Sequence, residues 1–81
     1  MTTYDTKSLY IAAALLTIGM ELQTIERRAT DPQRAVFTFS DENGACRSLA
    51  QQYRIDQFPP LQPQAFINKV FYCRDRAEQA R

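Results

Sequence analysis

The longest apolar run of the chain spans residues 9–19 and reads LYIAAALLTIG. At about 100° per residue, its leucines, isoleucines and most of its alanines occupy two adjoining sides of a helix. Only Tyr10, Ala14 and Thr17 remain for a narrow strip that faces water. The pattern therefore predicts a central helix that is covered from two directions. It should end at Gly19, where a left-handed conformation costs least.

The residues before this run carry short side-chain oxygens, which cap helices by accepting a free amide of the first turn. The plausible caps are Thr3, Asp5, Thr6 and Ser8, and we place the cap at Asp5 or Thr6. Three adjacent alanines within the helix indicate that another element packs closely against it. A larger side chain at Ala12 or Ala13 should therefore destabilise the fold more than one at Ala14.

Two stretches with β-branched and aromatic residues follow, at residues 20–27 (MELQTIER) and 35–40 (AVFTFS). They predict two strands. Asp31-Pro32 between them marks a turn, so the strands should form an antiparallel hairpin. A two-stranded hairpin is only marginally stable alone, so helices must cover one of its faces.

The alternation along these strands selects their inward faces. Phe37 and Phe39 share one face of the second strand and are the predicted core anchors. On the first strand, Met20 and Leu22 share a face, but Ile25 is out of phase with them. A β-bulge near residues 23–24 would return Ile25 to the core side.

A second helix is predicted at residues 42–54, where the capping-rich segment SDEN precedes an amphipathic stretch. Its predicted inner side carries Ala45, Cys46, Leu49, Ala50 and Tyr53. Its predicted outer side carries Arg47, Gln51 and Arg54. Gly44 in the first turn lowers the local helix stability by up to about 1 kcal/mol relative to alanine.

Residues 55–62 should be irregular, because their two prolines remove amide donors and hold the chain extended. Within this segment, Phe58 and Leu61 should close the edge of the core. Pro63 suits the first turn of a third helix that runs to about Ala77. Its predicted inner side carries Phe66, Ile67, Val70, Cys73 and Ala77. Its predicted outer side carries Lys69, Tyr72, Asp75 and Arg76.

The predicted order of elements is thus α-β-β-α-α. We expect a single small α+β domain over residues 1–81. Its central N-terminal helix should pack between a two-stranded antiparallel hairpin and two C-terminal helices. The ordered core should cover about residues 4–77, because the polar end EQAR is typical of a loose C-terminal tail.

A set of these positions matches a pattern shared by known sequences. The set comprises Tyr4-Asp5-Thr6, Leu9, Ala12-Ala13, Leu15, Gly19, Phe37, Phe39, Pro63 and Phe66. It resembles a family of short uncharacterised bacterial, plasmid and phage proteins that is known only as a domain of unknown function. The resemblance covers residues 4–72. It implies a shared fold and an origin near mobile genetic elements, and it implies no activity.

Composition and charge add modest constraints. The hydrophobic content of 44% and the charged content of 23% are ordinary for a globular domain, and the net charge of +1 favours no particular partner. Eight of the ten basic residues are arginine. The planar guanidinium suits carboxylate or phosphate contacts, although a genome-wide bias toward arginine would give the same count.

The apolar run at residues 9–18 is too short for a bilayer, which needs roughly 20 apolar residues. The chain also opens without the basic start of a signal peptide, so we assign it to the cytoplasm. Cys46 and Cys73 form neither a disulfide framework nor a zinc pattern, and both fall on apolar helix faces. They are therefore predicted to be small buried thiols.

Several catalytic chemistries have no candidates in this sequence. It contains no histidine, which excludes imidazole catalysis and histidine-ligated metals, and its two glycines are too far apart for a phosphate-binding loop. Carboxylate pairs such as Glu21 with Glu26 or Asp41 with Glu42 are better explained by solvation and helix capping. We expect no enzyme, no cofactor, no metal, no small-molecule substrate and no membrane contact.

The favoured hypothesis is a non-catalytic binding module that docks a protein partner or associates with itself. The small size, an exposed hairpin edge and the surface aromatics Tyr10 and Tyr72 motivate it. The alternative hypothesis is nucleic-acid binding through two groups of candidate contacts. These are Arg27, Arg28 and Arg34 around the hairpin turn and Arg47, Gln51 and Arg54 on the second helix. If both groups lie on one side, they would form a phosphate-binding patch.

Overall fold

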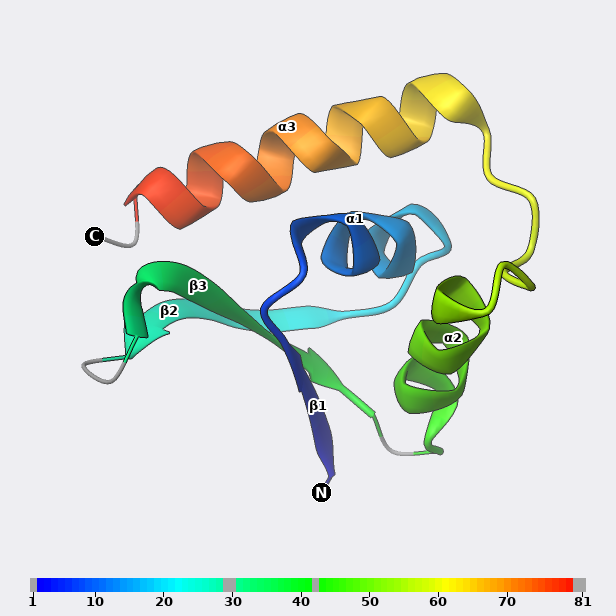
Figure 1. The fold of residues 1–81 in the computed structure, drawn as a ribbon, viewed down its shortest axis with the longest axis horizontal. Helices are drawn as coiled ribbons and strands as arrows, with labels where there is room; N and C mark the ends of the chain where they lie inside the picture. The colour runs from blue at the N-terminus through cyan, green and yellow to red at the C-terminus, as the bar shows by residue number, and fades with distance from the viewer. Residues whose placement is uncertain (1, 29–30, 42, 80–81) are drawn as a thin grey trace.

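The computed structural model describes residues 2–28, 31–41 and 43–79. Its elements are β1 (Thr3–Thr6), α1 (Leu9–Thr17), β2 (Leu22–Arg28), β3 (Asp31–Ser40), α2 (Ala45–Arg54) and α3 (Pro63–Gln79). Figure 1 shows α1 enclosed between α3 and the sheet, with α2 standing at one end of the sheet. The predicted α+β class and the central place of the first helix are therefore confirmed.

The sheet differs from the predicted hairpin, because it has three antiparallel strands in the order β1-β3-β2. The N-terminal segment forms β1, in which Tyr4 lies opposite Phe39 and Thr6 opposite Phe37. The element order is thus β-α-β-β-α-α, and the predicted order α-β-β-α-α is wrong. The half of β3 near Ser40 would otherwise expose unpaired backbone groups, and the extended N-terminal chain satisfies them.

The predicted cap of the first helix is also wrong, since Asp5 and Thr6 belong to β1. Ser8 is the N-cap instead, and its hydroxyl accepts a hydrogen bond from the amide of Ile11 at 3.3 Å. Pairing of residues 3–6 with β3 leaves Ser8 as the nearest residue that can cap the helix. The strand therefore determines where the helix begins.

The C-terminal end of α1 confirms the prediction for Gly19. This residue adopts φ +97°, and its amide donates to the carbonyl of Leu16 at 3.0 Å. The amide of Met20 donates to the carbonyl of Leu15 at 3.0 Å. These two bonds form a Schellman motif, which reverses the chain from α1 toward β2 and needs a left-handed residue at this position.

The β-bulge near residues 23–24 is confirmed. Leu22 lies opposite Phe39 and Thr24 lies opposite Thr38, so Gln23 is the extra residue of β2. As a result, Leu22 and Ile25 both pack against the core, as predicted.

The predicted turn at Asp31-Pro32 is wrong, because β3 begins at Asp31, which lies opposite Arg28. The connection itself, residues 29–30, lies outside the described residues. Pro32 lies beyond the end of the pairing with β1 and within the irregularity between the pairs Arg28–Asp31 and Arg27–Ala35 of the ladder with β2. A proline is tolerated at such a position because one side of the strand needs no ladder hydrogen bond.

The core forms around α1. Phe37 and Phe39 are at most 2% exposed, which confirms them as the inward anchors of β3. Ala12, Ala13 and Ala14 are all fully buried. The prediction that Ala14 faces water is therefore wrong, because β1, α2 and α3 all contact α1 and cover more of its circumference than two adjoining sides.

Helix α2 begins three residues later than predicted. Gly44, expected inside the first turn, precedes the helix with φ +71° and has no side chain to cap it. The buried carboxylate of Asp41 accepts the amide of Cys46 at 2.9 Å in its place. Ala45 is exposed rather than inward, because it is the first residue of the helix and lies at its outer end. The other four predicted inner residues are buried or pack against the core.

The segment after α2 is irregular, as predicted, and Phe58 packs edge to face on Tyr53 with a centroid distance of 5.8 Å. α3 starts at Pro63, also as predicted, and continues to Gln79. Its predicted inner residue Ile67 is 45% exposed. α3 lies along the outside of the molecule, so only one narrow stripe of its surface faces the core (Figure 1). That stripe comprises Phe66, Val70, Cys73 and Ala77.

Candidate functional site

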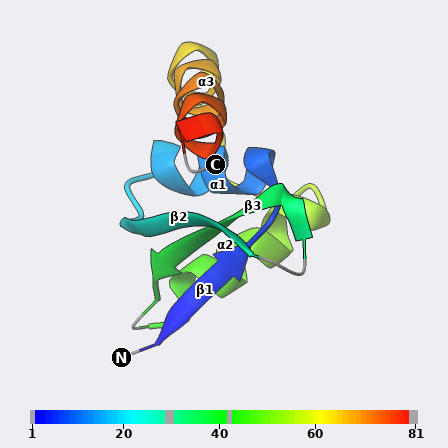
Figure 2. The ribbon, with the colours of Figure 1, turned by 90° about the vertical axis from the view of Figure 1, so that its left-hand side faces the viewer.

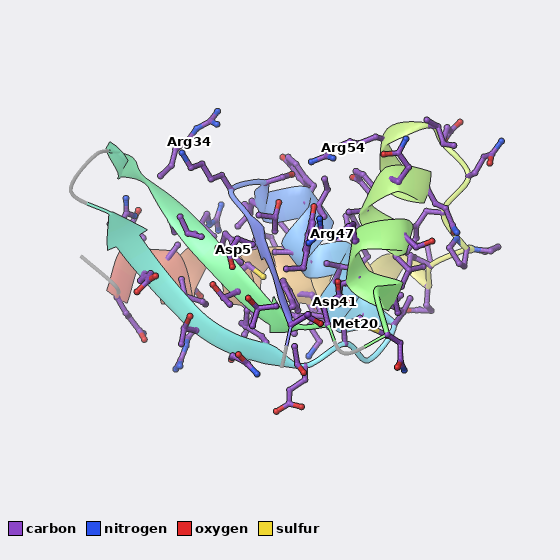
Figure 3. All side chains as sticks on the ribbon, turned by 90° about the horizontal axis from the view of Figure 1, so that it is seen from below. Asp5, Met20, Arg34, Asp41, Arg47 and Arg54 are labelled. Atoms are coloured by element: carbon purple, nitrogen blue, oxygen red, sulfur yellow. The ribbon has the colours of Figure 1, made fainter. Side chains whose placement is uncertain are left out.

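The exposed arginines expected to bind phosphate lie in two separate places. Arg47, Gln51 and Arg54 are exposed on α2, and Arg34 is exposed on β3. Figure 3 shows Arg34 on one side of β1 and Arg47 and Arg54 on the other. The exposed carboxylate of Asp5 lies on β1, between the two groups. The structure therefore places Arg34 and the two arginines of α2 on different sides of β1.

Arg27 of the hairpin group makes a specific contact inside the molecule. Its Nε and Nη2 atoms donate hydrogen bonds to the carbonyl oxygen of Ala77, at 3.3 and 3.0 Å. A guanidinium in the last turns of a helix satisfies a carbonyl group there and interacts favourably with the helix dipole. Arg27 thereby joins β2 to α3. Arg28 is the last residue of β2, and its side chain lies outside the described parts of the structure.

A cleft of about 460 Å³ lies between β2 and the C-terminal half of α3. It is lined by Leu16, Leu22, Gln23, Thr24, Ile25, Tyr72, Arg76 and Gln79. Figure 2 shows α3 on one side of α1 and β2 on the other, at the edge of the sheet. These two walls are the elements that Arg27 joins, so the contact between Arg27 and Ala77 holds the cleft in shape.

The lining of this cleft combines apolar and polar side chains. Its apolar part comes from Leu16, Leu22 and Ile25, and its polar part from two glutamines and a threonine. Among the described residues that line it, Arg76 is the one with a charge. The described residues of the lining include no carboxylate, thiol or imidazole, and their hydroxyl groups are those of Thr24 and Tyr72.

Tyr72 connects the cleft to a cationic surface on α3. Its ring is 43% exposed, with the Lys69 Nζ atom 5.6 Å and the Arg76 Cζ atom 5.8 Å from its centroid. One position earlier, Phe71 is 48% exposed and has the Arg74 Cζ atom 4.9 Å from its centroid. Such cation–π contacts hold the cations beside exposed apolar surface.

Part of this surface is predictable from the amino-acid sequence. Tyr72 was expected as an exposed aromatic, and its exposure confirms this. Phe71 was not singled out, although it falls one position off the inward stripe of α3 and the helical period could have shown it. The role of Arg76 depends on β2 and α3 meeting, which no local pattern indicates.

Both cysteines are free and fully buried, as predicted. Burial raises the pKa of the Cys73 thiol from 9.0 to about 11. Burial, together with the nearby Asp41 carboxylate, also raises the pKa of Cys46. In the part of the chain that the structure describes, no three histidine, cysteine or acidic residues gather where they could hold a metal ion.

The raised pKa of Cys73 predicts a loss of stability in alkali. Between about pH 9 and pH 11 the thiol ionises in the unfolded chain while it stays protonated in the folded one. Its contribution is therefore fully present below pH 9 and is lost by up to about 1.4 kcal/mol per pH unit above it. Urea unfolding of the wild type and of Cys73→Ala across this pH range gives the free energy of unfolding of each protein. All other groups titrate in both proteins, so the difference between their pH dependences comes from the Cys73 thiol. Equal slopes of stability against pH would contradict the prediction.

Comparison with known proteins gives one match. The family model Domain of unknown function (DUF5659) matches residues 1–72. No curated protein and no solved structure matches the chain. Among the described residues, no helix has the length and apolar character needed to cross a membrane. The family match ends within α3, so it includes β2 and Tyr72 but not Arg76 or Gln79.

Proposed function

Because the chain belongs to DUF5659, a family without an assigned activity, we propose its function from its own geometry: a small non-catalytic module that binds a protein partner in the cleft between β2 and α3. The proposal keeps the expectations of a cytoplasmic protein of bacterial, plasmid or phage origin. It assigns no catalytic role, cofactor or metal to any residue.

The observation that carries this proposal is the composition of the cleft and its surroundings. An apolar hollow with a polar margin opens beside Tyr72, which is one of three large side chains of α3 that are 43–48% exposed. These are Ile67, Phe71 and Tyr72. Aromatic residues and arginine are the types enriched at protein interfaces, and exposed apolar surface beside polar groups marks such sites. A partner would bury this surface.

Docking of a different protein is favoured over self-association on grounds of area. Three side chains that are about half exposed offer roughly 250–300 Å² of surface, given about 150–250 Å² for each large side chain. A stable dimer buries about 800 Å² on each partner. The exposed strip on α3 is therefore too small to hold two copies together by itself, whereas a partner that also fills the cleft gains additional contact.

Nucleic-acid binding through the arginines ranks second. Arg34 lies on a different side of β1 from Arg47 and Arg54, and Arg27 already donates to Ala77. Phosphate affinity grows with the number of cations that reach one backbone, so separated groups contribute less. This alternative becomes an outcome of the experiment below.

The test compares two double variants with the wild type. Tyr72→Ala/Arg76→Glu alters the cleft, and Arg47→Glu/Arg54→Glu alters the predicted phosphate contacts by a larger change of charge. Tagged proteins are used to capture partners from nuclease-treated host cells, and the partners are quantified by mass spectrometry. We expect the cleft variant to lose its specific partner at least tenfold and the α2 variant to retain it.

Circular dichroism first checks that both variants are folded. A partner retained by the cleft variant would contradict the proposal. Loss of capture in the α2 variant, together with a mobility shift of DNA or RNA at low salt, would favour the nucleic-acid alternative. Light scattering coupled to size exclusion tests self-association, for which we expect a monomer in the micromolar range.

A further inference from the structure

The cleft reaches around the edge of β2. Four consecutive residues of the chain line it, from Leu22 to Ile25. Successive side chains of a strand point to opposite faces, so a cleft that touches all four must extend along the edge as well as over one face. The bulge at Gln23 turns the strand at this point. Bound chain would therefore contact the backbone of β2 and the hollow beside it at the same time.

This edge of β2 is available for pairing. The sheet order is β1-β3-β2, so among the described strands none pairs with the outer side of β2. The register is irregular between Leu22 and Thr24 and again between Arg27 and Arg28. Only residues 24–27 between the two irregularities form a regular ladder. Such irregularities limit pairing along an edge, so it suits a short extended segment and not another sheet.

The charges at the cleft select the chemistry of that segment. Arg76 is the one charged residue in the described part of the lining, and Lys69 brings a second cation to the ring of Tyr72. Glu26 follows Ile25 in the regular part of β2, so its side chain points to the face of the sheet opposite that of Ile25. An arginine binds a carboxylate through two parallel hydrogen bonds, and the apolar hollow next to it accepts one large side chain.

We infer that the cleft binds a short extended peptide segment of an acidic partner, which pairs with the edge of β2, inserts one large apolar side chain and places a carboxylate on Arg76. This inference rests on the proposed function and names the class of ligand. The two statements can fail separately. A partner that occupied the cleft through a folded or basic surface would contradict this inference and would still agree with the proposed function.

Selection from a random ten-residue peptide library on the full chain tests the inference. We expect enriched peptides that share an aspartate or glutamate within three positions of one leucine, isoleucine or phenylalanine. Synthetic copies should bind at least tenfold more weakly to Arg76→Glu and to Tyr72→Ala. The matched control Arg54→Glu, which has the same charge change on α2, should bind them as the wild type does. Amide shifts on binding should concentrate at residues 22–27 and 72–79.

A second set of peptides tests the strand pairing. One peptide is methylated on the backbone nitrogens of its odd positions and another on those of its even positions. One of these two peptides should bind at least tenfold more weakly, because its methyl groups block the hydrogen bonds to β2. No loss in either alternation would overturn the inference. A library without enriched peptides, enrichment of basic peptides, or equal binding to Arg76→Glu would also overturn it. Displacement of the peptides by an equimolar single-stranded oligonucleotide would overturn it in favour of a nucleic-acid site.

Discussion

Replacement of Phe39 by alanine is expected to lower the free energy of unfolding by about 3–5 kcal/mol. The ring of Phe39 is fully buried, and the residue sits in the central strand with Tyr4 opposite it in β1 and Leu22 opposite it in β2. Its removal therefore leaves a cavity where all three strands meet. A domain of this size has a total stability of about 4–12 kcal/mol. The substitution should therefore remove at least about a quarter of the total stability.

Urea unfolding followed by circular dichroism measures this loss. Phe71→Ala is the matched control, because it removes the same side chain from a position that is 48% exposed. We expect the control to change the free energy of unfolding by less than about 1 kcal/mol. Similar losses in the two variants would contradict the central position of β3 in the core.

Leucine at Ala13 or at Ala14 is expected to lower the free energy of unfolding by about 1–3 kcal/mol at either position. Both alanines are fully buried in α1, which β1, α2 and α3 contact. The additional carbon atoms must displace a neighbouring element or force a strained rotamer. Leucine is a good helix former, so the helix itself bears little of the loss.

Comparison of the two alanines tests the structure against the prediction from the helical pattern. The pattern alone predicts that Ala14 tolerates a larger residue, whereas the structure predicts equal losses at both positions. Tyr10→Leu is the control on the same helix, because Tyr10 is 56% exposed. Thermal unfolding of the three variants compares them directly. A wild-type melting temperature for Ala14→Leu would show that the helix is covered from two directions only.

The features that periodicity determines could be predicted from the sequence. Phe37 and Phe39 alternate with polar or smaller residues, and Ile25 is out of phase with Leu22, which leaves a bulge as the way to bury both. Gly19 and Pro63 mark a helix end and a helix start through their backbone preferences. In each case the local residues carry the information.

Strand β1 could not be predicted in this way. Its four residues, TYDT, have the oxygen-bearing side chains that cap helices, and they show no strand pattern long enough to compete. Their pairing depends on the free half of β3 more than 30 positions along the chain. The sequence therefore supports two local interpretations, and a contact between distant segments decides between them.

The candidate site was only partly predictable for the same reason. Its lining comes from α1 and β2, which are neighbours in the sequence, and from α3, which is distant from both. Arg27 illustrates the difference between residue type and place. Its position at the hairpin suggested a phosphate contact, but the fold directs its guanidinium to the carbonyl of Ala77. The exposure of Tyr72 could be predicted from its position on the helix, but its place in the cleft depends on the packing of α3 on β2.

The packing of α1 against α3 has a consequence for synthesis of the chain. Pro63 follows Thr17 by 46 positions, so at 5–20 residues per second a ribosome needs about 2–9 s to reach α3 after completing α1. During this interval the nascent chain displays the apolar surface of α1 without its principal cover. Faster elongation shortens that exposure, and a chaperone that shields the emerging helix should raise the yield of native protein.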